Sequence, residues 1–512
     1  MGQPAIQMKY AESITVDDAR QHLQILASDE YEGRETGTKG AQKAALYIAN
    51  IFQEQGLGAP VENTYFQEMK LKGNSLDETT FMVKNSKKEF LKDFYITPNS
   101  IKNIDLNTEE ILFIGYGIHD SLYNDYQNIH ANGKVLFYIG EGEPTKDSLS
   151  ILTHSKKFSP WAKQSNKKLQ FATAQNPTLI LVYNPKVDLL NDAYRDYLKA
   201  STLELDSGQQ EQNNKPIVIN IGKNVADELL AATGKNVVQI QQSINESGTP
   251  MSMALPIHLS IKIQKTATSL RAHNVLGYLE GSDPVLKNEL LIITAHYDHI
   301  GMQTTGSDTI NNGADDDGSG TTAVLALAKA FSKAKKEGYA PKRSILFMTV
   351  VGEEKGLLGS AWYVQHPVFP LSNTITNLNI DMVGRVDKAH ENNPNYIYVI
   401  GSNKLSSTLG KINRKANDRY TKMTLDFTYD SPKDPNRFYY RSDHYNFAKN
   451  HIPIIFYFNG VHEDYHKPSD EVSKINFDLL VKRTRLVFHT AWEIANRTKR
   501  PALDNPHAVE EE

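Results

Sequence analysis

Apolar residues near the start of the chain recur at the three- and four-residue spacing of amphipathic helices. Residues 15–27 open with Thr15-Val16-Asp17-Asp18, which resembles a capping box with Asp in place of Glu. After a polar turn at residues 32–37, Thr38 can cap a second periodic stretch, which stops at Gln55-Gly56. The pattern therefore predicts two helices before the first strand of any sheet.

From about residue 95 to about residue 255 the pattern changes to short β-prone runs separated by polar connections that contain Asn and Ser. The runs lie at residues 111–114, 134–139, 178–183 and 216–221. We therefore expect a β-rich domain over residues 95–255, inserted between an N-terminal part at residues 10–94 and a main part at residues 256–500.

After Arg271 the predicted strands alternate with predicted helices. The strands lie at residues 275–280, 290–295, 344–351, 377–382 and 452–458, and the helices at residues 320–336 and 476–497. Alternation of this kind favours an α/β fold with a mixed, largely parallel central β-sheet flanked by helices.

Charge and composition narrow the class of partner. The chain has 56 basic and 60 acidic residues, a net charge of -4, so no overall field favours nucleic acid or an anionic membrane. The sequence contains no cysteine, which excludes disulfides, thiolate metal ligands and a cysteine nucleophile. Any metal ion must therefore be held by nitrogen and oxygen ligands.

The longest apolar runs, such as Ile454 to Phe458, are far shorter than the ~18 to 20 residues that span a bilayer, so no transmembrane segment is predicted. The opening Met1-Gly2-Gln3-Pro4 lacks the basic and apolar regions of a signal peptide. Two interpretations stay open: a cytoplasmic protein, or an exported protein whose signal has been removed.

Five positions in the second half of the chain carry side chains typical of zinc ligands: His296, Asp316, Glu354, Asp381 and His466. Two histidines and three carboxylates, one of them shared, can hold two zinc-like ions close together. Three of the five lie at or just after predicted strands, and ligands of open α/β sheets bind at the carboxyl ends of strands.

Asp316 lies in the glycine-flanked loop at residues 312–320, directly before a predicted helix. An acidic N-capping loop is the simpler interpretation of this segment. Three consecutive Asp residues, Asp315 to Asp317, are more than capping requires. The glycines also allow the backbone to approach an ion closely, which favours a metal-binding loop.

The pair Glu353-Glu354 follows a strand that is expected to be buried. Two surface glutamates on a solvated loop would be the ordinary interpretation, but the apolar strand at residues 345–351 argues against it. We expect Glu354 to bind a metal ion and Glu353 to act as general base towards the attacking water. A second carboxylate, Asp298, is placed to fix the tautomer of His296.

Residues 462–466 match the H-E-x-x-H pattern of one-zinc proteases. That pattern needs a helix, and Asn459-Gly460 before it and Lys467-Pro468 after it disfavour one. We therefore interpret the match as a loop that carries His466. Tyr465, directly before this ligand, is a candidate donor to a developing oxyanion.

These motifs, in this order, resemble the M28 metallopeptidases. The resemblance is carried by Ala295-His296-Tyr297-Asp298-His299, the loop at residues 313–320, Glu353-Glu354 with residues 356–360, Ile380-Asp381-Met382, Arg441-Ser442-Asp443-His444 and residues 464–470. The resemblance implies a co-catalytic dizinc exopeptidase, usually an aminopeptidase, that acts on peptides. One zinc ion would be held by His296 and Asp381, the other by Glu354 and His466, with Asp316 between them.

The resemblance also implies features around the metal ligands. A cis peptide bond is expected between Asp316 and Asp317, and Asp317 is expected to support the ligands together with Asp298. The segment at residues 95–255 looks like the protease-associated (PA) domain that some members carry as an insertion. Such members are commonly secreted, which favours a periplasmic or secreted protein over a cytoplasmic one.

Three other functions remain open at this point. A non-catalytic, receptor-like binding protein would have lost ligands, whereas all five are present. A glutaminyl cyclase would use a similar frame with one zinc ion and no insertion. A carboxypeptidase specific for acidic dipeptides would need basic residues that bind the product carboxylates, and Arg437 and Arg441 are the candidates.

Overall fold

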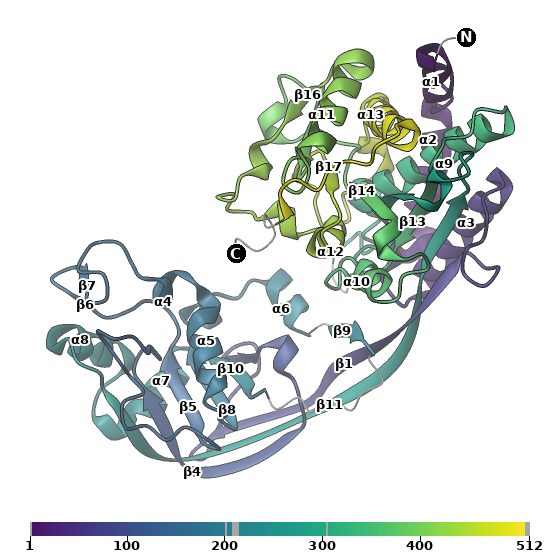
Figure 1. The fold of residues 1–512 in the computed structure, drawn as a ribbon. Helices are drawn as coiled ribbons and strands as arrows, with labels where there is room; N and C mark the ends of the chain where they lie inside the picture. Colours follow the sequence, from purple (N-terminus) through teal and green to yellow (C-terminus); the bar gives the residue numbers. More distant parts are fainter. Residues whose placement is uncertain (1–2, 200–201, 207–214, 304–305, 507–512) are drawn as a thin grey trace. The chain divides into compact units, whose positions relative to one another are not determined.

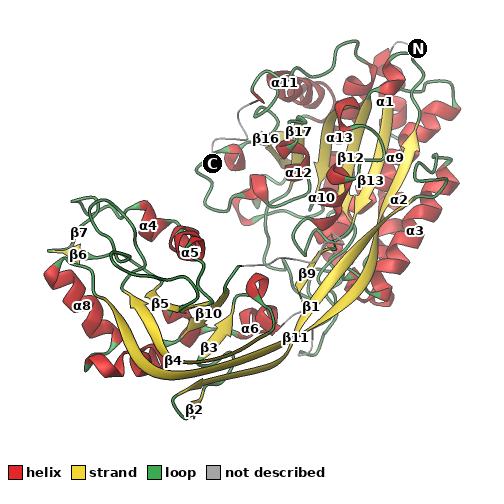
Figure 2. Cartoon of the chain, turned by 60° about the horizontal axis from the view of Figure 1, so that its bottom comes forward, coloured by secondary structure: helices red, strands yellow, loops and turns green. Residues whose placement is uncertain are grey.

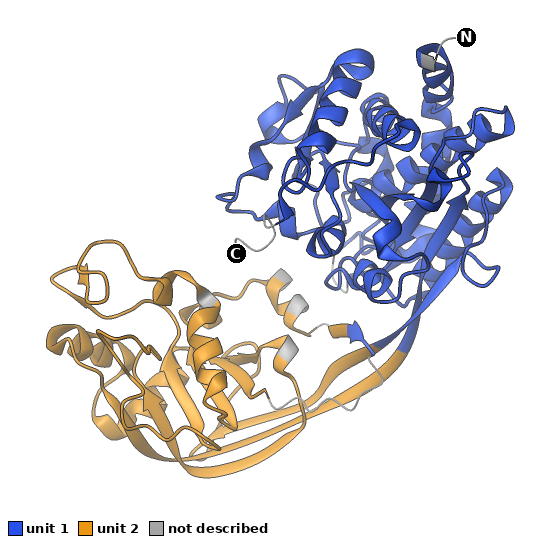
Figure 3. Ribbon diagram, viewed as in Figure 1, with its two compact units in different colours: residues 1–71, 204–206, 270–512 blue, residues 72–203, 207–269 orange. Residues whose placement is uncertain are grey.

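The computed structural model describes residues 3–199, 202–206, 215–303 and 306–506, and the chain divides into two compact units (Figure 3). Unit 1 comprises residues 1–71, 204–206 and 270–512, and unit 2 comprises residues 72–203 and 207–269. Unit 2 is therefore an insertion in the sequence of unit 1.

The strands of unit 1 have the order β16-β15-β17-β14-β12-β13-β11. Figure 1 labels all of these strands except β12 and β15. Strand β12 pairs in parallel with both β13 and β14, and β14 pairs in parallel with β17, whereas β11–β13 and β15–β17 are antiparallel. The predicted mixed, largely parallel sheet is confirmed. The bounds are β11 (Ser252–Leu279), β12 (Leu290–His296), β13 (Ser344–Val350), β14 (Thr374–Ile380), β15 (Tyr396–Ile400), β16 (Thr424–Asp426) and β17 (Ile454–Phe458).

Helices cover both faces of this sheet, and every residue of β12, β13 and β14 is buried. On one face, Phe331 of α9 (Gly320–Lys336) packs against Phe347 of β13 and Phe488 of α13 (Phe477–Asn496). On the other face, α10 (Leu358–Gln365) and α12 (His444–Lys449) contribute to one apolar cluster with Leu290 and Ile292 of β12. Figure 2 shows α3 and α9 alongside this sheet.

The four helices predicted in unit 1 are present, and the first two begin at their predicted caps. Thr15 accepts a hydrogen bond at the start of α2 (Val16–Leu26), and Thr38 does so for α3 (Lys39–Gln55), which ends at the left-handed Gly56. A further helix, α1 (Gln3–Ala11), precedes them and was not predicted. Among the described residues, no helix is long and apolar enough to cross a bilayer.

In unit 2 the strand order continues from β11 as β11-β4-β5-β8-β10-β3. Strands β4, β5, β8 and β10 are parallel neighbours, and their apolar residues form a separate core. The bounds are β1 (Phe66–Val83), β2 (Ser86–Lys87), β3 (Phe94–Ile96), β4 (Ile104–Ile114), β5 (Val135–Ile139), β6 (Thr145–Lys146), β7 (Leu149–Ser150), β8 (Leu179–Tyr183), β9 (Thr202–Leu205) and β10 (Ile217–Ile221).

Unit 2 differs from the β-rich domain predicted over residues 95–255. It also contains helices, with the bounds α4 (Pro160–Lys163), α5 (Ser165–Ala174), α6 (Asp192–Lys199), α7 (Lys223–Leu230) and α8 (Val237–Ser247). Its limits at residues 72 and 269 lie outside the predicted ones, because parts of the long strands β1 and β11 belong to it.

Candidate metal centre

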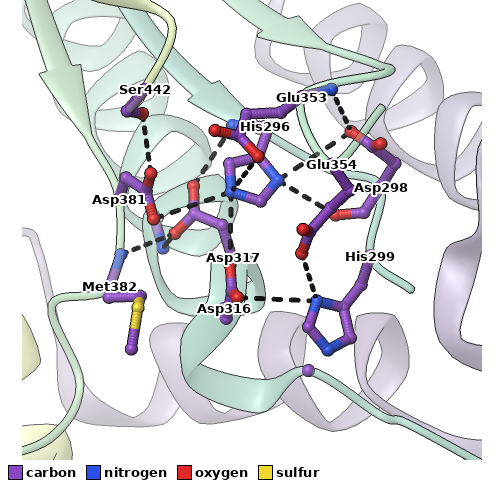
Figure 4. A network of polar contacts seen from close by, with 12 residues as sticks. His296, Asp298, His299, Asp316, Asp317, Glu353, Glu354, Asp381, Met382 and Ser442 are labelled. Carbon is purple, nitrogen blue, oxygen red and sulfur yellow. Dashed lines mark hydrogen bonds and ion pairs between the residues drawn. The ribbon is translucent and has the colours of Figure 1, made fainter. Parts of the chain in front are cut away.

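The candidate residues gather at the carboxyl ends of the central strands of unit 1 (Figure 4). His296 is the last residue of β12, Asp381 directly follows β14, and Glu353 and Glu354 lie just after β13. Because these three strands are parallel neighbours, their ends meet at one edge of the sheet. The sequence prediction of a site at the strand ends therefore agrees with where the structure places these side chains.

The structure brings all five predicted ligands together around Asp316. The Asp316 Oδ1 lies 3.3 Å from His296 Nε2, and its Oδ2 lies 3.0 Å from His466 Nε2. Asp381 Oδ1 is 3.6 Å from His296 Nε2, and Glu354 Oε2 is 3.2 Å from His466 Nε2. The two oxygens of Asp316 thus face two different histidine and carboxylate pairs.

Two sets of side chains have ligand atoms within 4.8 Å of one another. The first set is His299, Asp316, Glu354 and His466, and the second is His296, Asp317 and Asp381. All of these atoms are nitrogen or carboxylate oxygen, which are the zinc ligands available to a chain without cysteine. Each set therefore offers ligand atoms that fit a metal ion.

The negative charge of the site also favours the binding of cations. Six carboxylates, none more than 11% exposed, surround three histidines; they belong to Asp298, Asp316, Asp317, Glu353, Glu354 and Asp381. Buried carboxylates at this density are costly without compensating positive charge. The neighbouring Glu354 and Asp316 raise the pKa of His466 to about 10, even though burial lowers it. The carboxylates of the site thus favour positively charged groups beside them.

Glu353 and Glu354 contact different partners, as expected for a pair with divided roles. Glu354 lies beside His299 and His466, whereas Glu353 Oε2 lies 3.9 Å from His296 Nε2. Burial raises the pKa of Glu353 well above its usual value, and the charges of Glu354 and Asp381 raise it further. A carboxyl group in this environment binds a proton readily.

Asp298 supports His296 in a different way from the one we expected. The His296 Nδ1 lies 3.0 Å from the backbone carbonyl oxygen of Asp298 but 3.8 Å from its carboxylate. The carboxylate instead accepts hydrogen bonds from the Thr36 hydroxyl at 2.7 Å and from the Glu353 N–H at 3.3 Å. The ring contact is therefore made by the backbone carbonyl of Asp298, two residues after the end of β12.

Asp317 holds the loop at residues 314–319 rather than facing solvent. Its carboxylate accepts the backbone N–H groups of His296, Gly320 and Met382, at 3.1, 2.8 and 3.0 Å (Figure 4). The peptide bond between Asp316 and Asp317 is cis, which confirms the expectation. Asp470 fixes the other side of the loop, because its carboxylate accepts the N–H of Asp316 at 3.1 Å.

Residues 462–466 form turns and no helix, which confirms the interpretation of the H-E-x-x-H match as a loop. The His462 Nε2 lies 3.1 Å from Asp315 Oδ2, whereas His466 faces Asp316 and Glu354. The two histidines of the pattern therefore contact different carboxylates. The Tyr465 ring stacks on His466, with centroids 3.9 Å apart.

Sequence reasoning missed several residues that complete the site. His299 is fully buried, with Nδ1 2.9 Å from Glu354 Oε1 and with Nε2 lacking a hydrogen-bond partner. The buried Arg34 donates to the backbone carbonyls of Leu26, Tyr297, Asn312 and Gly313. The sequence could have indicated His299 by its position three residues after His296. It could have indicated Arg34 by its position within a glycine-flanked turn.

A small cavity opens beside this cluster. Arg441 lines it together with Tyr465, and Arg441 Nη2 lies 3.4 Å from the Tyr465 hydroxyl. Arg437 is not among the lining residues; its guanidinium lies over the ring of Tyr440. The apolar part of the lining consists of Met382, Phe438, Phe456, Phe458 and Val461.

The site lies within a segment that matches a known family. The family model described as Peptidase family M28 matches residues 274–491. Aminopeptidase YwaD of Bacillus subtilis is 26% identical over 297 residues, which are 56% of this chain and 57% of that protein. The chain thus spans little more than half the length of this curated relative.

Solved structures show the same fold over nearly the whole chain. The aminopeptidase from Aneurinibacillus sp. strain AM-1 has a TM-score of 0.60 at 19% identity and covers 97% of this chain and 98% of its own. The zinc aminopeptidase BSAP from Bacillus subtilis has a TM-score of 0.52 at 18% identity, covering 95% and 97%. These solved structures show the fold, and the match to peptidase family M28 over residues 274–491 contains every candidate metal ligand.

Proposed function

We propose that this chain is a dizinc exopeptidase, most consistent with an aminopeptidase that hydrolyses the N-terminal peptide bond of peptides. The observation that carries the proposal is the arrangement of Asp316, whose two carboxylate oxygens face His296 and His466 separately. Asp381 and Glu354 flank these two histidines. A carboxylate shared between two such pairs is the arrangement that two closely spaced metal ions require.

In this proposal, His296 and Asp381 would hold one zinc ion, Glu354 and His466 would hold the other, and Asp316 would contribute to both. Asp317 also lies close by, but its carboxylate already accepts three backbone N–H groups, so it supports the loop. Zinc ions bound here would supply Lewis-acid polarisation of the scissile carbonyl and lower the pKa of the attacking water.

Glu353 acts as the general base in this proposal. It takes a proton from the attacking water and delivers that proton to the nitrogen of the leaving amine. Its carboxylate lies 3.9 Å from His296 Nε2, beside the proposed ligands, and it lines the cavity. Tyr465 is held by stacking on His466 and donates its hydroxyl hydrogen towards the developing oxyanion.

The lining of the cavity favours an aminopeptidase over a carboxypeptidase specific for acidic dipeptides. A free α-amine is attracted by the carboxylates of Glu353 and Asp381, which both line the cavity. Recognition of product carboxylates would need several basic groups, and of the two candidate arginines Arg441 alone lines the cavity. The two sets of ligand atoms favour two zinc ions over the single ion of a glutaminyl cyclase.

We also propose that the insertion corresponds to a PA-like domain and that the protein is periplasmic or secreted. The division of the chain supports the first point, because unit 2 interrupts the sequence of unit 1. The second point rests on the resemblance to secreted members of the family, and cell fractionation with an antibody against the chain tests it.

Hydrolysis of a panel of aminoacyl p-nitroanilides by the wild-type chain and by Glu353→Gln tests the proposed function. We expect kcat to fall by about 10²- to 10⁴-fold in Glu353→Gln, since the base is lost, while the bound zinc remains. Glu463→Gln is the matched control, because Glu463 lies in the neighbouring loop and its side chain is 81% exposed. Unchanged turnover in Glu353→Gln would show that the base is assigned wrongly.

A further inference from the structure

A row of polar side chains runs from the metal centre into the core of unit 1. Thr294 precedes His296 by two residues on β12, and Asn379 precedes Asp381 by two residues at the end of β14. Side chains two positions apart on a strand share one face, and Thr294 lies directly opposite Asn379 in the ladder. These polar side chains therefore continue the same face that carries the two ligands.

The row is fully buried and connected by hydrogen bonds. Asn377 Nδ2 donates to Thr294 Oγ1 at 2.9 Å, and Thr294 Oγ1 donates to Asn379 Oδ1 at 2.6 Å. Asn379 Nδ2 then donates to Ser442 Oγ at 2.9 Å. Ser442 Oγ donates to Asp381 Oδ2 at 2.6 Å, and Figure 4 shows this last bond. None of Asn377, Thr294, Asn379 and Ser442 is more than 1% exposed. We refer to these four residues as the polar relay.

Which group donates and which accepts in every hydrogen bond of the polar relay follows from Asp381, the carboxylate at its end. An ionised carboxylate only accepts, so the single hydrogen of Ser442 must go to Asp381. The Ser442 oxygen can then only accept from Asn379, which must present its amide nitrogen. The Asn379 oxygen consequently faces Thr294, whose single hydrogen must be donated to it. No member can reverse its direction without leaving a buried polar group unpaired.

We propose that the polar relay positions Asp381 for metal binding by fixing which of its two oxygens is free. Oδ2 is occupied by the Ser442 hydroxyl, while Oδ1 lies 3.6 Å from His296 Nε2. Thr294 therefore acts on the site through Asn379 and Ser442 and touches neither ligand. The proposal rests on the proposed function, since it assigns Asp381 to a zinc ion.

Thr294→Val tests the polar relay, because valine keeps the shape and removes the hydroxyl. Asn379 then loses the donor that orients its amide, and it can turn its oxygen towards Ser442, which draws the Ser442 hydrogen away from Asp381. Loss of partners of metal ligands typically weakens metal binding about 10- to 100-fold. We expect about tenfold weaker binding of one Zn²⁺ ion and unchanged binding of the other, measured by competition with a chelator.

Two matched variants separate this effect from a general loss of core packing. Thr294→Ser keeps the hydroxyl and is expected to restore wild-type zinc affinity. Thr349 lies on the neighbouring strand opposite Ala295, is fully buried, and its hydroxyl has no hydrogen-bond partner. Thr349→Val therefore makes the same chemical change outside the polar relay, and both zinc affinities are expected to stay at the wild-type level.

Ser442→Ala keeps the proposal testable if Thr294→Val does not fold, because Ser442 lies outside the sheet in the segment before α12. We expect this variant to weaken the binding of one Zn²⁺ ion by about 10- to 100-fold. In the double variant, Thr294→Val is expected to add no further loss, because its effect passes through the Ser442 hydroxyl. Additive losses would contradict the polar relay.

The outcomes for the polar relay and for the proposed function are distinguishable. A wild-type chain that holds two zinc ions, with Thr294→Val or Ser442→Ala holding both as tightly, overturns the polar relay alone. Equal weakening by Thr294→Ser or Thr349→Val also overturns it, because packing would then be the cause. A wild-type chain that binds no zinc overturns the proposed function and the polar relay together.

Discussion

At the scale of single residues, Arg34 stabilises the segments that carry the metal ligands, although it is not a ligand itself. Its guanidinium is 1% exposed and donates to four backbone carbonyls, three of them in the segments that carry His296 and Asp316. Its positive charge also lies among the carboxylates of Asp298, Asp316 and Asp317. Arginine suits this position because its five donors have a fixed planar geometry.

Arg34→Lys is expected to destabilise unit 1, since an ammonium group cannot reach all four carbonyls. The loss of at least one charge-assisted hydrogen bond costs about 1.5 to 3 kcal/mol of unfolding free energy, measured by urea denaturation. Arg271→Lys is the control, because the Arg271 side chain is 67% exposed and its ion pair with Glu68 lies at the surface. Equal stability of Arg34→Lys and the wild type would show that the carbonyls find other donors.

At the scale of elements, the carboxyl ends of β12 and β14 and the segment after β13 create the site, and α12 packs against β14 and β17. His444, the first residue of α12, donates from Nε2 to the Tyr439 carbonyl at 2.7 Å and stacks on Phe456 of β17. Burial lowers the pKa of His444 to about 3. The ring is therefore neutral in the folded chain at the pH values where it is protonated in the unfolded chain.

This shift makes the packing of α12 sensitive to acid. Because the folded pKa of His444 lies below the unfolded value of about 6.5, its contribution is fully present above that pH and is lost as the pH falls towards 3. His444→Gln keeps a donor but does not titrate. We expect the stability difference between wild type and variant to shrink by about 1.4 kcal/mol per pH unit between pH 6 and pH 4, measured by urea denaturation. A pH-independent difference would contradict a neutral His444.

The elements also show what sequence can predict. Helices α2, α3, α9 and α13 were predicted from apolar periodicity, and capping residues added support for α2 and α3. The helices of unit 2 have at most 11 residues and were not predicted, whereas its buried parallel strands were marked by short apolar runs. The metal ligands were predicted because acidic and imidazole side chains stood at strand ends.

Residues whose role depends on distant contacts were not predictable in this way. Arg34 and its acceptor Tyr297 are 263 positions apart, and Ser442 and Asp381 are 61 positions apart. No local pattern marks such partners, because their spacing in the sequence is unrelated to their distance in the fold. The carbonyl contact of Asp298 was missed for another reason: it depends on how the backbone turns after β12.

At the scale of the whole molecule, the two units have separate cores, and the proposed zinc ligands all belong to unit 1. Zinc is therefore expected to stabilise unit 1 alone, by about 2.7 kcal/mol at a free concentration 100 times its dissociation constant. Hydrogen exchange with and without zinc measures this: protection should rise in β12 and stay unchanged in β10 of unit 2. Equal protection of both strands would contradict a site confined to unit 1.

Zinc titration of the chelator-stripped chain, followed by elemental analysis and by hydrolysis of an aminoacyl p-nitroanilide, tests the central claim most directly. The five ligands around Asp316 predict that zinc content and activity saturate together at two ions per chain, and that His466→Ala retains one ion. Full activity in the metal-free chain, or saturation of both measurements at a single ion, would contradict the dizinc account.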